Sequence, residues 1–256
     1  IVNISKRKGP GMLYVIGSGP GGADQITPRA EAAIGRSTVV AGYALYIDLI
    51  RDLVAGKKVI RTAMRGEVER CRKAIEAAVS GETVSVVSSG DAGVYGMAGL
   101  VYQLCAELAV AVQVEVIPGI TAATSAAAIL GAPLTHDFAV ISLSDLLTPW
   151  EEIESRLDLA SKAGFVIAIY NPVSKKRADF LKKACSIVSR NLGEGTACGY
   201  VKNIAREGQV CRVLTLKELA SASIDMFTTV IIGSKNTRII SGKLVTPRGY
   251  RLGGRA

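Results

Sequence analysis

Short runs of apolar, mostly β-branched residues alternate with helical patterns along the first half of this 256-residue chain. Strands with few polar positions are typical of a parallel sheet that helices cover on both faces. The sequence therefore predicts an α/β fold. We expect a helix at 66–80 with Val68, Ile75 and Val79 on one face. The other expected elements are strands at 12–16, 38–41, 59–60, 83–87 and 112–117 and helices at 27–35 and 94–108.

A Pro-Gly turn at 118–121 interrupts this alternation and opens an alanine-rich helix at 122–130. We place the domain boundary here, which predicts domains at 1–119 and 120–256. A short polar link containing Gly208 joins two strands of the second half and favours a hairpin, so a mixed sheet is expected there. The remaining elements expected are strands at 138–143, 165–170, 196–201, 209–214 and 228–232, helices at 149–163 and 175–189, and a short helix after Thr215.

The ends of the chain are rich in basic residues. Residues 1–8 lack the apolar core of a signal peptide, and we expect them to be a short basic leader. No apolar run approaches the roughly 18–20 residues that span a bilayer, so we expect no membrane segment. The tail after Gly233 is expected at the surface; its basic residues are Lys235, Arg238, Lys243, Arg248, Arg251 and Arg255.

The chain has five cysteines and no C-x-x-C motif. This pattern argues against a disulfide framework, a zinc ribbon or an iron–sulfur site, and it favours a reducing cytoplasm. The net charge of +9 attracts polyanions. Nucleic acid is one such partner, but aromatic residues make up only 5% and no nucleic-acid-binding motif occurs. A small substrate with many carboxylates fits equally well, and so does a basic surface with no role.

The loop that follows the predicted strand at 83–87 is the strongest candidate for a ligand site. It contains Ser89, Gly90 and Asp91, and ligands of open α/β sheets lie where strands end in such loops. Glycine lets a backbone approach a ligand closely, and Asp91 can accept hydrogen bonds from a hydroxyl or an amine. The loops after 12–16 and 112–117 should join it if those three strands are neighbours. Thr121 would then meet a ligand at a helix N-terminus.

Gly17, Gly19 and Gly22 satisfy the G-x-G-x-x-G spacing of dinucleotide-binding loops. Three features oppose a nicotinamide site. Pro20 lies inside the motif, the helix begins only near Thr27, and the strand at 38–41 lacks the acidic residue that holds a ribose. A plain tight turn is the structural alternative for this loop.

Further polar residues follow strands of the second half. Ser144, Asp145 and Thr148 come after one strand, although Asp145 and Thr148 could simply cap the next helix. His136 is the single histidine, and a lone histidine is more often structural than catalytic. No nucleophile elbow and no histidine–carboxylate metal cluster occurs. These observations favour an enzyme that positions two small molecules and relies on the reactivity of its cofactor.

Three segments in order carry a resemblance to a known family: Val15–Gly21, Ser89–Asp91 and Pro118–Ala122. Together they resemble the tetrapyrrole methylases of cobalamin biosynthesis, which use S-adenosylmethionine. The resemblance extends from Met12 to Tyr250. Within the family, the chain is similar to the branch that methylates C17 of precorrin-3B or its cobalt form. The segments similar to that branch are 89–100, 141–150, 170–174 and 246–250, and Ala92 is more like the cobalt-dependent version.

The resemblance implies a two-domain fold, with an N-terminal parallel-sheet domain and a C-terminal mixed-sheet domain that hold the cofactor in the cleft between them. It also implies a homodimer. Asp91 is expected near the ribose or the amino-acid end of the cofactor. Carried over by position, the cofactor-binding residues are Pro20, Asp91, Val94, Tyr95, Thr121 and Ala122, with Tyr170, Val201 (or Lys202) and Thr228 (or Thr229) from the second domain.

The implied reaction is transfer of the methyl group to C17, coupled to ring contraction, with S-adenosylhomocysteine as product. Asp145, His136 and Lys202 are the candidates for managing protons, and no protein-bound metal is expected. Arginines such as Arg61 or Arg65 would suit the carboxylates of the tetrapyrrole. Two alternatives stay open: a methyltransferase of the same fold acting on another precorrin carbon or on uroporphyrinogen, and a basic nucleic-acid-binding module.

Overall fold

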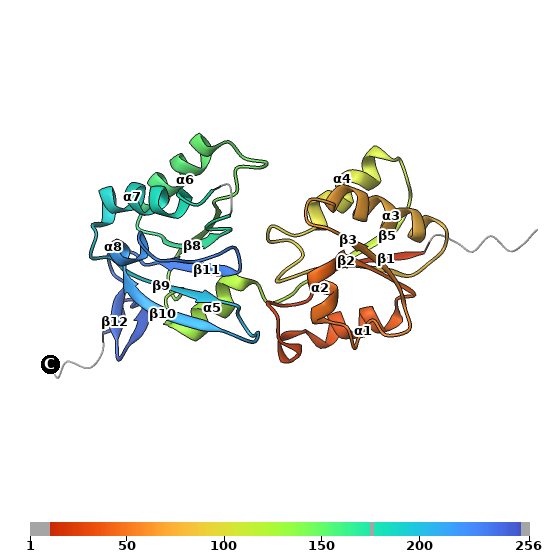
Figure 1. Cartoon of the computed structure of the whole chain (residues 1–256), viewed down its shortest axis with the longest axis horizontal. Helices are drawn as coiled ribbons and strands as arrows, with labels where there is room; N and C mark the ends of the chain where they lie inside the picture. Colours follow the sequence, from red (N-terminus) through yellow and green to blue (C-terminus); the bar gives the residue numbers. More distant parts are fainter. Residues whose placement is uncertain (1–10, 175–176, 252–256) are drawn as a thin grey trace, which may run out of the picture. The chain divides into compact units, whose positions relative to one another are not determined.

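The computed structural model describes residues 11–174 and 177–251, and it divides into two compact units, 1–122 and 123–256 (Figure 1). The sequence placed this division after Gly119. The predicted basic leader at 1–8, the predicted helix start at 175 and the basic residue Arg255 lie outside the described residues. No helix of the described residues is long and apolar enough to cross a membrane.

The N-terminal unit is built on a five-stranded parallel sheet in the order β3-β2-β4-β1-β5. The predicted parallel sheet is thus confirmed, with the strands that precede the three candidate loops, β4, β1 and β5, side by side. The strands are β1 (Met12–Gly17), β2 (Val39–Tyr43), β3 (Lys58–Thr62), β4 (Val84–Ser88) and β5 (Gln113–Ile117).

Helices cover both faces of this sheet (Figure 1). Leu13 and Val15 of β1 are fully buried under α3 (Glu67–Val79) and α4 (Ala98–Glu107). Ile16 faces the opposite side, under α1 (Pro28–Arg36) and α2 (Ala44–Leu49). The predicted start of α1 is confirmed: Thr27 caps it by accepting a hydrogen bond from the Ala30 N–H, and Pro28 is its first residue. A short 3-10 helix, η1 (Ala23–Gln25), separates the glycine loop from α1.

The C-terminal unit contains a five-stranded sheet in the order β10-β9-β11-β8-β7. This sheet is mixed, as the sequence predicted. Helices α6, α7 and α8 bury one face, and Leu130 of α5 contacts Gly199 on the other. The predicted hairpin of β9 and β10 is antiparallel. The elements are α5 (Ala122–Leu130), β7 (Phe138–Ser142), α6 (Trp150–Lys162), β8 (Val166–Tyr170), α7 (Phe180–Leu192), β9 (Ala197–Lys202), β10 (Val210–Thr215), α8 (Leu216–Leu219) and β11 (Thr228–Ile232).

The described part of the tail is not merely a surface segment, which corrects the sequence prediction. Strands β12 (Arg238–Ile240) and β13 (Lys243–Val245) form a hairpin, and β13 also pairs with β6 (Gly131–Ala132). Leu244 is fully buried. The Thr246 hydroxyl lies 2.8 Å from that of Thr237, so this strand is fixed by packing and by hydrogen bonds.

Two helix predictions are also corrected. Helix α4 begins at Ala98, four residues later than predicted, because Tyr95 has a positive φ of 53° and the Met97 N–H donates to the Ser88 hydroxyl instead. In α3, Val68 and Val79 are about half exposed, and the buried face consists of Arg70, Cys71, Ala74, Ile75 and Ala78. An arginine on this buried face was not expected.

The cysteines differ sharply in burial, which predicts their order of reactivity. Burial raises the pKa of Cys71 to about 11 and that of Cys185 to about 12, and it also raises the pKa of Cys198. Cys211 is exposed. Because the thiolate is the reactive form, a thiol reagent at about pH 8 should modify Cys211 first and these three only on unfolding. Mass spectrometry of peptides from native protein checks this; early labelling of Cys198 would contradict it.

Candidate functional site

The loops that follow β1 and β4 are joined by backbone hydrogen bonds. The Gly19 N–H donates to the Gly90 carbonyl at 3.0 Å, and the Gly90 N–H donates to the Gly19 carbonyl at 2.7 Å. The Ser18 N–H and hydroxyl both donate to the Ser88 carbonyl. Gly19 and Gly90 have φ values of 76° and 70°, which glycine adopts readily. The two loops therefore form one rigid structure at the carboxyl end of the sheet.

The loop that follows β5 packs directly against these two loops. A Cβ atom at Gly119 would lie 2.2 Å from the Gly90 carbonyl oxygen and 2.5 Å from that of Gly17. A Cβ at Gly17 would lie 2.7 Å from the Gly119 nitrogen. At these two positions the absence of a side chain allows another loop to approach closely. We call Gly17, Gly90 and Gly119 the glycine junction.

Asp91 fastens the glycine junction from one side. Its Oδ2 accepts a hydrogen bond from the Gly119 N–H at 2.9 Å, and its Oδ1 accepts one from the Gly93 N–H at 2.7 Å. A carboxylate has about four acceptor positions, so each oxygen keeps one for a ligand. Asp91 is half-buried. It can therefore hold the loops together and accept a hydroxyl or ammonium donor at the same time.

The other predicted cofactor residues of the N-terminal unit lie in the same three loops. Pro20 follows the Gly19–Gly90 bridge, and Val94 and Tyr95 follow Asp91. Tyr95 is 56% exposed. The Thr121 Cα and the Ala122 nitrogen lie 3.8 Å from the position of a Cβ on Gly90. The structure thus brings the predicted set of this unit together around the glycine junction.

A second group of polar side chains lies where β7 and β8 end. The Ser142 hydroxyl accepts hydrogen bonds from the Asn171 side-chain amide at 2.9 Å and from the Ser144 N–H at 3.2 Å. The Leu143 N–H donates to the Tyr170 carbonyl. These bonds hold the loops after the two parallel strands side by side.

Asp145, a predicted catalytic residue, lies in this second group and has a cationic partner. Its Oδ1 is 3.6 Å from Nη1 of Arg177, whose side chain is only 14% exposed. The Arg177 Nε donates to the Ser174 hydroxyl at 3.0 Å. Sequence reasoning missed Arg177, because it assigned this position to a helix that in fact begins at Phe180. The Arg177 guanidinium thus places a positive charge beside Asp145.

Lys202, another predicted catalytic residue, forms an ion pair in which its Nζ lies 2.7 Å from Asp225 Oδ2. Asp225 Oδ1 also accepts hydrogen bonds from the Phe227 N–H and the Thr228 hydroxyl. Burial alone would raise the pKa of Asp225, but these bonds and the Lys202 charge outweigh burial, so the pKa is lowered. Lys202 and Thr228 therefore belong to one network at the end of β9.

The Asp225 network predicts an acid-sensitive part of the stability. Because the folded pKa of Asp225 is lowered, its contribution is complete above the ordinary aspartate pKa of about 4 and is lost as the pH falls through the folded value. Between about pH 5 and pH 2, the melting temperature of the wild type should therefore fall by more than that of Asp225→Asn. Calorimetric melting curves across this range check the difference; parallel pH profiles for both proteins would contradict it.

The remaining predicted site residues of the C-terminal unit, Tyr170, Val201 and His136, lie at different places along the strands β7, β8 and β9. Tyr170 ends β8, and its hydroxyl accepts a hydrogen bond from the Ala123 N–H at 2.8 Å, at the start of α5. Val201 is fully buried in β9. His136 precedes β7, whereas Asp145 follows it, so the two lie at opposite ends of this strand. The structure therefore does not bring His136 to Asp145.

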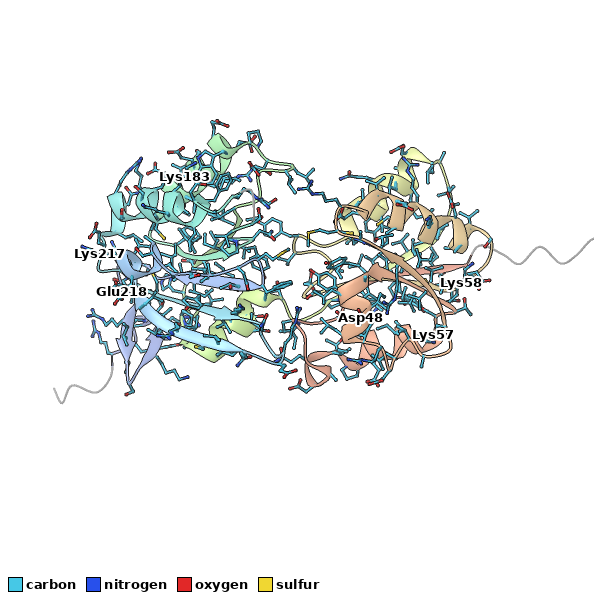
Figure 2. All side chains as sticks on the ribbon, viewed as in Figure 1. Asp48, Lys57, Lys58, Lys183, Lys217 and Glu218 are labelled. Carbon is cyan, nitrogen blue, oxygen red and sulfur yellow. The ribbon has the colours of Figure 1, made fainter. Side chains whose placement is uncertain are left out.

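Two arginines were predicted to bind the carboxylates of the tetrapyrrole: Arg61 lies within β3, and Arg65 follows it. Arg61 is paired with Asp48 at 2.6 Å, and Figure 2 labels Asp48 on the N-terminal unit. Arg65 is exposed, with a φ of 71° that is unusual for a residue with a side chain. In the described residues no group of three or more His, Cys, Asp or Glu side chains could hold a metal ion.

Comparison with known proteins decides which family has this arrangement. The model of the tetrapyrrole (corrin/porphyrin) methylases matches residues 12–220. The chain belongs to this family. The tetrapyrrole methylase is 45% identical to the probable cobalt-factor III C(17)-methyltransferase of Salmonella typhimurium, over 94% of this chain and 100% of that protein.

A second relative is longer than this tetrapyrrole methylase. The chain is 44% identical to the cobalt-factor III methyltransferase of Priestia megaterium, over 94% of its own length but only 45% of that protein. Among solved structures, the methyltransferase CobJ superposes with a TM-score of 0.86 at 35% identity, covering 93% of this chain and 100% of CobJ. The predicted two-domain tetrapyrrole methylase fold is thereby confirmed.

Proposed function

We propose that this tetrapyrrole methylase transfers a methyl group from S-adenosylmethionine to C17 of cobalt-factor III, or of precorrin-3B, and contracts the macrocycle, in cobalamin biosynthesis. The observation that carries the proposal is the 45% identity over the whole length of a relative with that name. The glycine junction adds support, because it lies at the carboxyl end of a parallel sheet, where α/β proteins bind ligands.

The residues around the glycine junction suit this cofactor. Asp91 keeps free acceptor positions for a ribose hydroxyl or the ammonium group, and the half-buried Val94 and the exposed Tyr95 offer apolar surface for the adenine ring. S-adenosylmethionine supplies an electrophilic methyl group when bound. We propose Pro20, Asp91, Val94, Tyr95, Thr121 and Ala122 as its contacts from residues 1–122.

In the C-terminal unit, we propose Asp145 as the group that holds or accepts a proton during ring contraction. Arg177 lies 3.6 Å from Oδ1 of this carboxylate, which leaves Asp145 Oδ2 for the substrate. Tyr170, Val201 and Thr228 remain proposed cofactor contacts. Lys202 is proposed to act through Asp225. His136 lies at the other end of β7 and has no part in the proposal.

Three further features belong to the proposal. The substrate carries several carboxylates, which the net charge of +9 attracts. The enzyme works as a homodimer, which sedimentation analysis would test. It works in the cytoplasm, in keeping with five free cysteines. We retain 1–119 and 120–256 as the functional domains.

Calorimetric titration with S-adenosylhomocysteine tests the cofactor assignment. We expect micromolar binding with one site per chain. Methylation assays on a panel of tetrapyrroles then test the acceptor: cobalt-factor III should be methylated, and uroporphyrinogen III should not. A folded protein that binds no S-adenosylhomocysteine would contradict the proposal, and so would a preference for uroporphyrinogen.

A further inference from the structure

Arg70 is a buried arginine in the N-terminal unit. It lies on the inner face of α3 and is 4% exposed. Other arginines of this unit form ion pairs at the surface, such as Arg61 with Asp48 and Arg72 with Glu107. Arg70 has no such carboxylate partner among residues 11–174 and 177–251. A buried guanidinium without an anion is unfavourable, so its presence calls for an explanation.

The hydrogen-bond donors of Arg70 are poorly matched. Nη1 donates to the Thr62 hydroxyl, a neutral acceptor. Nη2 lies 3.8 Å from the Met97 sulfur, which is a weak acceptor. Nε is buried and has no hydrogen-bond partner. A guanidinium offers five N–H donors in a planar fork that fits a carboxylate. The charge and most of the donors of Arg70 therefore remain uncompensated.

The partners of Arg70 locate it at the ligand-binding end of the sheet. Thr62 is the last residue of β3, and Met97 closes the loop that begins with Asp91. Two apolar side chains of these loops, Met64 and Tyr95, are about half exposed. The methionine side chain is flexible, so Met97 can move aside and make Nη2 of Arg70 accessible to a ligand.

Resting on the proposed function, we infer that Arg70 binds a carboxylate of a ligand at this end of the sheet, and that Met97 covers the guanidinium until the ligand arrives. The chemistry needed is one carboxylate presented beside an apolar surface. An acetate or propionate side chain of the tetrapyrrole is one source, and the amino-acid end of the cofactor is the other. Arg70 is then a specificity-determining residue that neither Arg61 nor Arg65 replaces.

Binding of a stable probe tests this inference without catalysis. We would titrate the protein with uroporphyrin III, an octacarboxylate porphyrin, and with its octamethyl ester, following porphyrin fluorescence. Arg70→Met should weaken uroporphyrin binding about tenfold or more, because a charge-assisted pair is lost, and it should leave binding of the ester unchanged. Arg70→Lys should retain part of the affinity. The matched control is Arg72→Met, which removes the same charge from the exposed side of α3 and should bind like the wild type.

Melting curves and titration with S-adenosylhomocysteine complete the test. Arg70→Met should melt no lower than the wild type, because it removes an uncompensated buried charge. If Arg70→Met weakens the binding of S-adenosylhomocysteine and not that of uroporphyrin, the carboxylate that Arg70 binds belongs to the cofactor. A lower melting temperature with both affinities unchanged would show a structural role and overturn the inference. A wild type that binds no S-adenosylhomocysteine contradicts the proposed function, whereas the Arg70 inference is overturned when Arg70→Met changes the affinity for neither ligand.

Discussion

Gly119→Ala should destabilise the N-terminal unit by about 3 kcal/mol and abolish binding of S-adenosylhomocysteine. The added methyl would lie 2.2 Å from the Gly90 carbonyl oxygen and 2.5 Å from that of Gly17. Both atoms belong to backbone that is fixed by the strands β4 and β1, so neither can move away cheaply. Relief of the clash has to separate the loops, which removes the geometry on which the proposed cofactor site depends. Thermal unfolding and calorimetry measure the two effects.

Gly99→Ala is the matched control for this substitution. Gly99 lies in α4, and a Cβ there would meet no heavy atom within 4 Å. Alanine in a helix is better than glycine by about 0.5–1 kcal/mol, so the control should melt slightly higher than the wild type and bind normally. A Gly119→Ala protein with wild-type stability and affinity would show that the loops are not packed as described.

Asp91→Ala should cost about 2 kcal/mol of stability and lower the affinity for S-adenosylhomocysteine at least about tenfold. The substitution leaves the Gly93 and Gly119 N–H groups without their acceptor, and it also removes the carboxylate that we propose for the cofactor. Asp91→Asn keeps one oxygen acceptor, so its stability and affinity should lie between those of Asp91→Ala and the wild type. Calorimetry on all three proteins measures both quantities.

Asp52→Ala serves as the control for loss of an exposed carboxylate in the same unit, and it should change neither quantity. If Asp91→Ala lost stability but bound S-adenosylhomocysteine as tightly as the wild type, Asp91 would only fasten the loops, and its assignment to the cofactor would be wrong.

Local sequence signals predicted the sheet of the N-terminal unit well. β-branched runs predicted the strand at 12–16, observed as Met12–Gly17, and the strand at 83–87, observed as Val84–Ser88. Burial on both faces makes such strands apolar throughout, which is easily recognised. The boundaries of helix α5 agree with the prediction because the Pro-Gly turn before it breaks the preceding strand.

The missed elements depend on contacts that are distant in sequence. Strand β13 pairs with β6 across more than a hundred residues, Leu244 opposite Gly131, and no local pattern encodes that pairing. The short helix α2 directly follows β2 in an apolar stretch, where periodicity cannot separate helix from strand. The late start of α4 follows from the positive φ of Tyr95 and from the hydrogen bond that the Met97 N–H donates to the Ser88 hydroxyl at the end of β4.

The site was predicted only in part. Spacing and strand order correctly brought Asp91 beside the loops after β1 and β5. The sequence showed neither that Arg177 pairs with Asp145 nor that Asp225 pairs with Lys202, because each pair joins different loops. The predicted strand at 138–143 did place His136 before it and Asp145 after it, and β7 (Phe138–Ser142) confirms that the two lie at opposite ends.

The most direct test of the account is the position of the transferred methyl group. The purified protein would be incubated with cobalt-factor III and S-adenosylmethionine carrying a ¹³C-labelled methyl, and the product analysed by mass spectrometry and NMR. The account predicts one added methyl, bonded to C17 of a contracted macrocycle. A label on another carbon, or no transfer to cobalt-factor III or precorrin-3B by a protein that binds S-adenosylhomocysteine, would contradict it.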